Sequence, residues 1–339
     1  MYKFLIRPLL FRMEAERAHR LLISFLKFTN YLPFFRRAMQ NRYQYEEELL
    51  VCKGIVCKNR VGLAAGLYKG AEVFNELSDY GFGFIEVGTV TPDACEGNPL
   101  PRMFRVPQYT SLITCTGFNN PGMKVVQERL EKKSGRVAIG VNINRNVGSE
   151  GEQAVNDFVK LYAGLYTYAD YFTINWDSLD STLMCSVLKS IVDERAKYVV
   201  KRPILLKIPA DVTAEDMDCV LILVKEYALD GVIATGPSAD HSQFRNSSST
   251  ELHALEDGMV CGKGIGMKSL FVVDYLRKHG GNELLIIGAG GIMTPNDAAR
   301  MIHMGADFVQ IYSAFVYEGP AMVAKMIQAV AEADDKDER

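Results

Sequence analysis

From residue 61 onward, short runs of apolar and often β-branched residues alternate with longer segments whose apolar residues recur at helical spacing. The short runs predict strands and the longer segments predict helices. The eight predicted strands are Arg60–Ala64, Phe84–Thr89, Val137–Ile143, Tyr171–Asn175, Ile204–Ile208, Gly231–Thr235, Leu284–Gly288 and Phe308–Tyr312. The predicted helices include Gln153–Tyr168, Thr182–Tyr198, Ala214–Tyr227, Met267–Lys278, Asn296–Met304 and Pro320–Ala331. This alternation predicts an α/β fold with a parallel sheet, and eight units are the number in a (β/α)8 TIM barrel.

A doubly wound open sheet is the alternative α/β fold. Dinucleotide-binding proteins of that kind carry Gly-x-Gly-x-x-Gly directly after the first strand, and no such motif follows the first predicted strand here. The glycine-rich segment Gly262-Lys-Gly-Ile-Gly266 lies between the sixth and seventh predicted strands instead. It closes a long polar loop, 236–266, of the length that is typical of functional loops. The pattern therefore favours the barrel.

Residues 1–42 follow a different pattern. Ala18, Leu21, Leu22 and Phe25 form one helical stripe, and the segment holds nine Lys and Arg against two Glu, a net charge of +7. A basic amphipathic helix is typical of a membrane surface. The alternative is a helix packed on the barrel with its arginines in water. We predict three parts: an N-terminal amphipathic helical extension (1–42), a barrel (43–332) and a charged tail (333–339).

Composition narrows the function further. The chain of 339 residues has a formal net charge of −3, which argues against a nucleic-acid partner. Its seven cysteines form no C-x-x-C pair and its five histidines show no metal-ligand spacing, so no metal site is predicted. The sequence shows neither an apolar run long enough to span a membrane nor a secretory signal. These features favour an intracellular protein with reduced thiols.

Polar residues stand at or just past the ends of five predicted strands. They are Asn142, Asn175, Lys207, Thr235 and Ser313. In a barrel, the carboxyl ends of the strands form the rim at which active sites lie. The sequence therefore predicts a site that draws on several strands at this rim.

The ends of the last two predicted strands indicate a phosphate site. Ile287-Gly-Ala-Gly-Gly-Ile292 ends the seventh, and Gln310-Ile-Tyr-Ser313 ends the eighth. Glycines let backbone N–H groups approach phosphate oxygens, and the loops after strands seven and eight bind phosphate in many barrels. The alternative is a pair of tight turns without a ligand.

Lys207 places an ammonium group inside an apolar strand, Leu205-Leu-Lys-Ile-Pro209. A buried charge needs an anionic partner or a shifted pKa. Lys207 is therefore a candidate Schiff-base nucleophile or an electrostatic support for an electron-rich cofactor, and a solvent-exposed lysine is the third possibility. Lys69, just beyond the first predicted strand, has the same options.

Seen together, the motifs resemble those of one family. They are Ala64-Ala-Gly-Leu67 with Lys69, Gly88-Thr-Val-Thr-Pro92, Gly117-Phe-Asn-Asn120, Asn142, Ile174-Asn175, Lys207, Gly288-Ala-Gly-Gly-Ile292 and Gln310-Ile-Tyr-Ser313. Their order along the chain is similar to that in dihydroorotate dehydrogenases. Residues 1–42, which include Glu16-Arg-Ala-His19, resemble the N-terminal extension of the class 2, membrane-associated, quinone-linked branch.

The resemblance implies an FMN-dependent oxidoreductase of pyrimidine biosynthesis that oxidises dihydroorotate to orotate and passes the electrons to a quinone. The positions that match the family's cofactor site are Ala65, Gly66, Thr89, Asn142, Asn175, Lys207, Thr235, Gly262, Gly291, Tyr312 and Ser313. The substrate positions are Lys69, Asn119 and Asn175, and Ser178 stands where the class 2 branch has its catalytic base. The N-terminal helices would form an apolar tunnel for the quinone and place the protein peripherally on the cytoplasmic side of the membrane.

The match is weakest around the substrate. The family usually reads Asn-x-Ser-Ser-Pro-Asn-Thr after strand four, whereas this chain reads Asn175-Trp-Asp-Ser-Leu-Asp-Ser181. Asp180 thus replaces a substrate-binding amide, Gly236 replaces a second one after strand six, and Tyr68 replaces the usual Asp before Lys69. An ionised Asp180 about 4 Å from a substrate carboxylate would repel it by roughly 4 kcal/mol at an effective dielectric of about 20.

Three functions remain open on these residues. The first is a quinone-linked dihydroorotate dehydrogenase with an altered substrate site. The second is a related flavin oxidoreductase for another small substrate, for which Asp177 and Asp180 would suit a neutral or cationic group. The third is a flavin-binding protein that has lost turnover.

Overall fold

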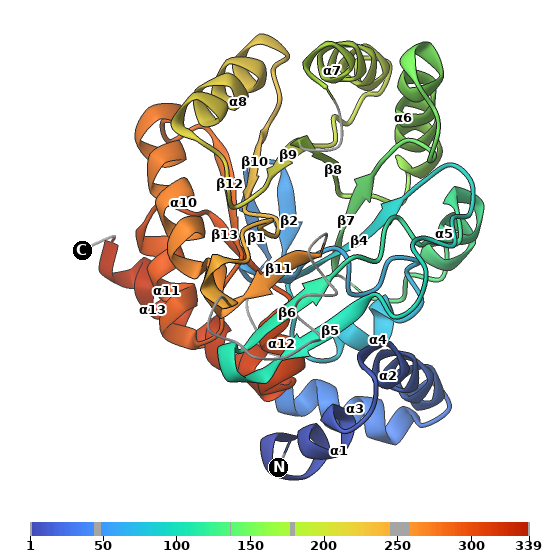
Figure 1. Ribbon diagram of the computed structural model, residues 1–339, viewed down its shortest axis with the longest axis vertical. Helices are drawn as coiled ribbons and strands as arrows, with labels where there is room; N and C mark the ends of the chain where they lie inside the picture. Colours follow the sequence, from blue (N-terminus) through green and yellow to red (C-terminus); the bar gives the residue numbers. More distant parts are fainter. Residues whose placement is uncertain (1, 44–48, 136, 177–179, 245–257, 338–339) are drawn as a thin grey trace.

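The computed structural model describes residues 2–337 except 44–48, 136, 177–179 and 245–257. Its central element is a closed barrel of parallel strands in the order β10-β12-β13-β3-β4-β7-β8-β9. These are β3 (Val61–Leu63), β4 (Phe84–Val90), β7 (Ala138–Ile143), β8 (Tyr171–Asn175), β9 (Ile204–Ile208), β10 (Gly231–Ala234), β12 (Leu285–Ala289) and β13 (Phe308–Ile311). Each coincides with a predicted strand to within one residue at either end. The predicted (β/α)8 barrel is therefore confirmed (Figure 1).

Helices surround the barrel on its outside (Figure 1). They are α4 (Phe74–Ser78), α5 (Met123–Leu130), α6 (Gly151–Leu165), α7 (Ser181–Arg195), α8 (Ala214–Glu226), α10 (Gly266–Gly280), α11 (Pro295–His303), α12 (Ser313–Glu318) and α13 (Ala321–Asp337). The six predicted helices all begin within two residues of an observed one. The end of α13 differs from the prediction, because the helix continues through most of the predicted tail 333–339. Alanine and glutamate residues, which favour helix, carry it onward from Ala331.

Shorter elements lie outside the barrel and were not predicted. An antiparallel hairpin joins β1 (Leu50–Cys52) to β2 (Ile55–Cys57). A three-stranded sheet in the order β11-β6-β5 joins Met259–Gly262, Ser111–Thr114 and Met103–Val106. Single 3₁₀ turns occupy Pro107–Tyr109, Ser242–Phe244 and Lys263–Ile265. Strands of three or four residues give too short a pattern to be recognised by periodicity, and β11 lies inside the segment that we predicted as a long loop.

The N-terminal extension is helical, as expected. It contains the π-helical turn η1 (Tyr2–Ile6), α1 (Arg7–Phe11), α2 (Ala15–Thr29) and α3 (Pro33–Tyr43). In Figure 1 these helices lie together beside one edge of the barrel, close to α4 and the sheet of β5 and β6. None of the helices in the described part of the chain is long and apolar enough to cross a membrane.

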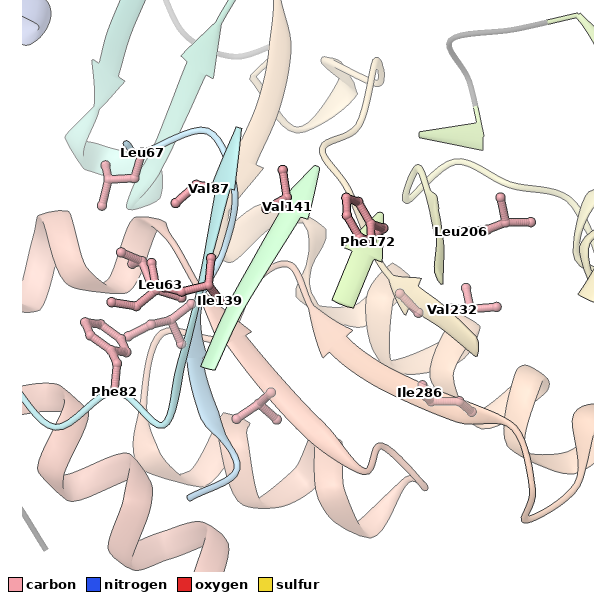
Figure 2. Close-up of a cluster of buried hydrophobic side chains, with 14 of the residues drawn as sticks. Leu63, Leu67, Phe82, Val87, Ile139, Val141, Phe172, Leu206, Val232 and Ile286 are labelled. Carbon is pink, nitrogen blue, oxygen red and sulfur yellow. The ribbon is translucent and has the colours of Figure 1, made fainter. Parts of the chain in front are cut away.

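Side chains on the outer face of the barrel pack against the helices. Leu63, Val87, Ile139, Phe172 and Leu206 are buried in this cluster (Figure 2). Their neighbours along each strand point to the barrel interior, because side chains alternate between the two faces of a sheet.

The interior of the barrel changes from apolar to polar along its strands. Near the amino ends, Phe84, Tyr171, Leu205 and Phe308 belong to a separate buried cluster. Two residues further along three of these strands stand Glu86, Lys207 and Gln310. This polar layer leads to the carboxyl rim, where the candidate site lies.

Candidate active site

A polar pocket of about 360 Å³ opens at the carboxyl ends of the barrel strands. All eleven residues expected to bind a cofactor line it: Ala65, Gly66, Thr89, Asn142, Asn175, Lys207, Thr235, Gly262, Gly291, Tyr312 and Ser313. Three of the expected substrate residues line it as well, namely Lys69, Gly236 and Asn175, which is expected in both roles. The structure therefore brings together residues from strands and loops that are almost 250 positions apart in sequence.

Hydrogen bonds between neighbouring strands fix the amides of this pocket. Thr89 Oγ1 donates to Asn142 Oδ1 at 2.6 Å, and Asn142 Nδ2 donates to Asn175 Oδ1 at 3.0 Å. Asn175 Nδ2 in turn lies 3.2 Å from Asn142 Oδ1. Because these side chains hold one another, their positions are set before a ligand binds.

Lys207 is paired rather than exposed. Its side chain is 11% exposed, and its Nζ lies 3.8 Å from Glu86 Oε1. Glu86 was not predicted as part of the site. Its position within the apolar run of β4 carries the same signal that singled out Lys207, namely a charge inside a buried strand.

Glycines bring two backbone segments into contact at one end of the pocket. Gly290 and Gly291 both have positive φ, at 89° and 72°. A Cβ atom on Gly291 would lie 2.1 Å from the Cα of Gly266, where α10 begins, and one on Gly290 would lie 2.8 Å from Thr235 Oγ1. Only glycine allows this approach, and Gly290, Gly291 and Ser313 all line the pocket.

Lys69 also lines the pocket, where the segment that follows β6 holds it. Its Nζ donates to Thr116 Oγ1 at 2.9 Å, to Gly117 O at 2.6 Å and to Asn119 Oδ1 at 2.7 Å. Burial, together with the nearby Arg102 guanidinium, lowers the pKa of Lys69 to about 8. Asn119 does not line the pocket itself, but it is joined to it through Lys69.

Asp180 is engaged away from this pocket. Its carboxylate caps α7 by accepting a hydrogen bond from Leu183 N at 3.0 Å. It lines a neighbouring cleft with Trp176 and Asp211, and it is not among the residues that line the polar pocket. The structure therefore does not place Asp180 with Lys69 in the polar pocket, and its carboxylate instead satisfies a backbone N–H group in the first turn of α7. Its role in substrate binding stays a prediction.

The expected catalytic base, Ser178, lies outside the described residues, as does Asp177. Tyr68, the third departure from the family pattern, is buried next to the N-terminal extension, with its ring 5.5 Å from that of His19. Burial raises the pKa of the Tyr68 hydroxyl. Tyr68 therefore packs between the barrel and α2 instead of lining the polar pocket.

Several residues line the polar pocket that we did not assign to it from the sequence. They include Thr116, Phe118, Cys261 and Gln310. Gln310 belongs to a quoted motif, and a polar residue inside an apolar strand is the signal that could have identified it. Phe118 likewise belongs to a quoted motif, whereas Cys261 lies in β11 and Thr116 follows β6, so these two could not be placed without knowing that β6 pairs with β11.

A second, apolar pocket of about 460 Å³ lies between the N-terminal helices and the barrel. The predicted stripe of α2 faces it, since Ala18, Leu21, Leu22 and Phe25 all line it. Burial lowers the pKa of His19, one of the few polar residues in its wall. Tyr312 and Thr114 line both pockets, so the two cavities share a wall.

The fold and the two pockets define a (β/α)8-barrel protein with a ligand site at its carboxyl rim and an adjoining apolar site under a helical extension. The family model for dihydroorotate dehydrogenase matches residues 50–333. The chain belongs to the dihydroorotate dehydrogenase family.

Relatives match over nearly the whole chain. A dihydroorotate dehydrogenase (quinone) of Christiangramia forsetii is 35% identical over 343 residues and covers 98% of this chain and 99% of its own. One from Verminephrobacter eiseniae is 36% identical, covering 96% of this chain and 94% of its own. A crystal structure of the Eimeria tenella enzyme in complex with ferulenol superposes with a TM-score of 0.82 at 28% identity, covering 95% of this chain and 92% of that one. The resemblance drawn from the motifs is confirmed.

Proposed function

We propose that this protein oxidises dihydroorotate to orotate with FMN bound in the polar pocket and a quinone as the electron acceptor. The main support is the likeness to quinone-linked dihydroorotate dehydrogenases, which extends through both the barrel and the N-terminal extension. The two adjoining pockets add to it, because an electron carrier between two substrates must be reachable from both sides.

The residues of the polar pocket fit FMN on two observations. Gly290 and Gly291 line the pocket where the backbone passes Gly266 too closely for any side chain, and a wall of bare backbone suits a phosphate group. Gln310 lines the pocket, and its Oε1 is buried without a hydrogen-bond partner in the described structure, so it can accept from a ligand. FMN, when bound, would take up two electrons from the substrate and release them to the acceptor.

The chain's own residues have separate tasks in this proposal. Gly291 and Ser313 would hold the phosphate, and Asn142, Thr89 and Lys207 would hold the polar edge of the ring system. Thr235, Tyr312, Ala65, Gly66 and Gly262 shape the remaining walls.

Substrate binding would rest on Lys69, whose ammonium group attracts a carboxylate, with Asn119 and Asn175 as hydrogen-bonding amides. Ser178 would remove a proton from the substrate ring. Since a hydroxyl group is a poor base, this serine needs a neighbouring acceptor for the proton.

The quinone would occupy the apolar pocket, and the N-terminal extension would lie on a membrane surface. Large apolar side chains of this extension are exposed, among them Phe4, Leu9, Tyr31 and Phe34. They stand among the nine basic residues of the segment. Exposed apolar groups next to positive charge suit the boundary of an anionic membrane, as in a peripheral protein at the cytoplasmic face.

A related substrate is the second candidate, and Gly236 favours it. A Cβ on Gly236 would meet nothing nearer than Ile208 O at 3.5 Å, so the position has room for the side chain that the family usually places there. The pocket consequently offers one amide fewer to the ring of dihydroorotate and more space at that point.

The visible spectrum of the purified protein tests the proposal, recorded without oxygen before and after dihydroorotate is added. We expect an oxidised-flavin band that bleaches. A yellow protein that dihydroorotate does not bleach would contradict this substrate, and would favour either the second candidate or a flavin-binding protein that has lost turnover. A colourless protein that takes up no FMN would contradict the flavin itself.

A further inference from the structure

Glu86 is a carboxylate in the middle of the barrel. It is 1% exposed, and its alternation with Ile85 and Val87 along β4 directs it to the interior. A side chain of this kind is almost never fully buried unless it is paired. The structure shows how it is paired, and with what.

Three neutral groups donate hydrogen bonds to this carboxylate. Tyr171 O–H donates to Glu86 Oε2 at 3.1 Å, and Gln310 Nε2 donates to the same oxygen at 2.8 Å. Gln310 Nε2 also lies 3.0 Å from Tyr171 O, so these two donors fix each other. Asn142 Nδ2 approaches the other oxygen, Oε1, at 3.5 Å. The carboxylate is thus held in one orientation, with Oε2 toward Tyr171 and Gln310.

The remaining partner of Oε1 is the ammonium group of Lys207 at 3.8 Å. Lys207 lines the polar pocket, whereas Glu86 lies beneath it and does not line it. The floor of the pocket therefore carries a positive charge at its surface and a matching negative charge just below. A pair of opposite charges in a buried site costs free energy relative to apolar packing, so its presence here calls for a role other than stability.

We propose that Glu86 is a positioning residue that fixes Lys207 at the pocket floor and offsets its charge, and that it thereby sets the reduction potential of the flavin. The inference rests on the proposed FMN site. A reduced flavin carries more negative charge than an oxidised one, so positive charge at the floor favours reduction. Glu86 weakens that effect, because an opposite charge at short range cancels much of the field of Lys207 in a site of low dielectric.

The variant Glu86→Gln keeps the shape of the side chain and removes its charge. Lys207 then acts on the flavin without a counter-ion. We expect the equilibrium to shift at least about tenfold toward the reduced flavin, which is a rise of about 30 mV in the two-electron midpoint potential. The measurement is a spectroscopic titration against a redox dye, and it requires no turnover.

Asp157→Asn is the matched control. Asp157 is a buried carboxylate on α6 that accepts a hydrogen bond from Asn146 N at 2.9 Å, and it does not line the polar pocket. We expect its midpoint potential to equal that of the unaltered protein. An equal potential in Glu86→Gln, with FMN bound, would overturn the inference.

Glu86→Asp covers the case in which Glu86→Gln does not retain FMN. It keeps the charge but withdraws the carboxylate from Lys207 by one methylene group, so the potential should rise in the same direction by a smaller amount. No rise, or a fall, would overturn the inference. Failure of the unaltered protein to bind FMN would instead overturn the proposed function, so the two failures are distinguishable.

Discussion

The polar and apolar pockets of this protein are of similar volume, about 360 and 460 Å³, but they are built by different means. The polar pocket is made of strand ends whose side chains are fixed by hydrogen bonds across the barrel, such as Thr89 to Asn142. The apolar pocket is made largely of side chains from the N-terminal helices that pack on the barrel surface, such as Leu22 and Phe25 of α2. The first construction favours exact placement of polar groups, and the second favours entry of a flexible apolar molecule.

One ion pair joins the two regions. Glu16 of α2 is buried, and its carboxylate accepts from Arg102 Nη2 at 2.9 Å and from Arg102 Nε at 3.3 Å. Arg102 Nη1 also donates to the carbonyl oxygens of Glu96, at 2.6 Å, and Asn98, at 2.8 Å. The helix that walls the apolar pocket is therefore tied to a loop of the barrel rim.

That loop supports Lys69. The backbone N–H of Asn98 donates to Thr116 O at 3.2 Å, and Thr116 Oγ1 accepts from Lys69 Nζ. Arg102 thus lies one loop away from the lysine proposed to bind the substrate. Substitutions confined to one pocket test whether the two act separately, and a substitution of Arg102 tests the link between them.

The largest effect should come from closing the polar pocket. In Gly291→Ala, the new Cβ would lie 2.1 Å from Gly266 Cα, and the residue would have to keep a φ of 72°. The backbone segments at Gly291 and Gly266 must therefore move apart. We expect FMN content to fall to near zero while the apolar pocket is unaffected. The ratio of flavin to protein absorbance measures this.

Gly148→Ala is the control for backbone strain. Gly148 also has a positive φ, 88°, but a Cβ there would meet nothing within 4 Å. A normal FMN content in this variant, together with loss in Gly291→Ala, would attribute the effect to the contact with Gly266. Full FMN content in Gly291→Ala would contradict the proposal that Gly291 helps to hold the phosphate group.

The second largest effect should be the change in ligand affinity with pH, which is about tenfold. The pKa of Lys69 is lowered to about 8 by burial. An anionic ligand binds its protonated form, which dominates below that pKa and is lost as the pH rises through it. Between pH 7 and pH 9, the Kd of orotate should therefore rise about tenfold. Perturbation of the flavin spectrum by orotate measures the Kd, and a constant value over this range would argue against Lys69 as the anion-binding group.

A residue's role could be predicted from the sequence where that role depends on its neighbours along the chain. The barrel strands follow from periods of apolar residues, and Lys207 is conspicuous because it interrupts one of them. Glu86 interrupts another in the same way, but its pairing with Lys207 depends on the closed barrel, which brings the interior faces of β4 and β9 together although β7 and β8 lie between them, and no local pattern contains this.

The substrate side was harder to predict for the same reason. The substrate-binding role of Asp180 was predicted from its place in a motif. Its observed contact depends instead on the start of α7, where a backbone N–H group without a partner inside the helix donates to the carboxylate. Lys69 was placed correctly at the rim. Its three partners come from a segment about 50 residues away, which only the small sheet β11-β6-β5 positions.

The smallest effect, and the one that tests the link between the pockets, should come from Arg102→Lys. Lysine keeps the charge but lacks the planar fork that binds Glu16 and two backbone carbonyls at once. The loop under Lys69 should loosen, and the Kd of dihydroorotate should rise by about fivefold, which is about 1 kcal/mol. Rapid-mixing measurements of flavin reduction by dihydroorotate give this Kd without any quinone.

Arg36→Lys separates this effect from a general loosening of the extension. Arg36 of α3 pairs with Asp79, its Nη2 lying 3.1 Å from Asp79 Oδ1, and so anchors the extension at the end of α4 instead of at the loop beneath Lys69. We expect it to leave the Kd of dihydroorotate unchanged. Equal changes in both variants would mean that the extension acts on the substrate pocket only by covering the barrel. A change confined to Arg102→Lys would show that Arg102 itself, through its bonds to Glu16 and to the loop beneath Lys69, supports substrate binding.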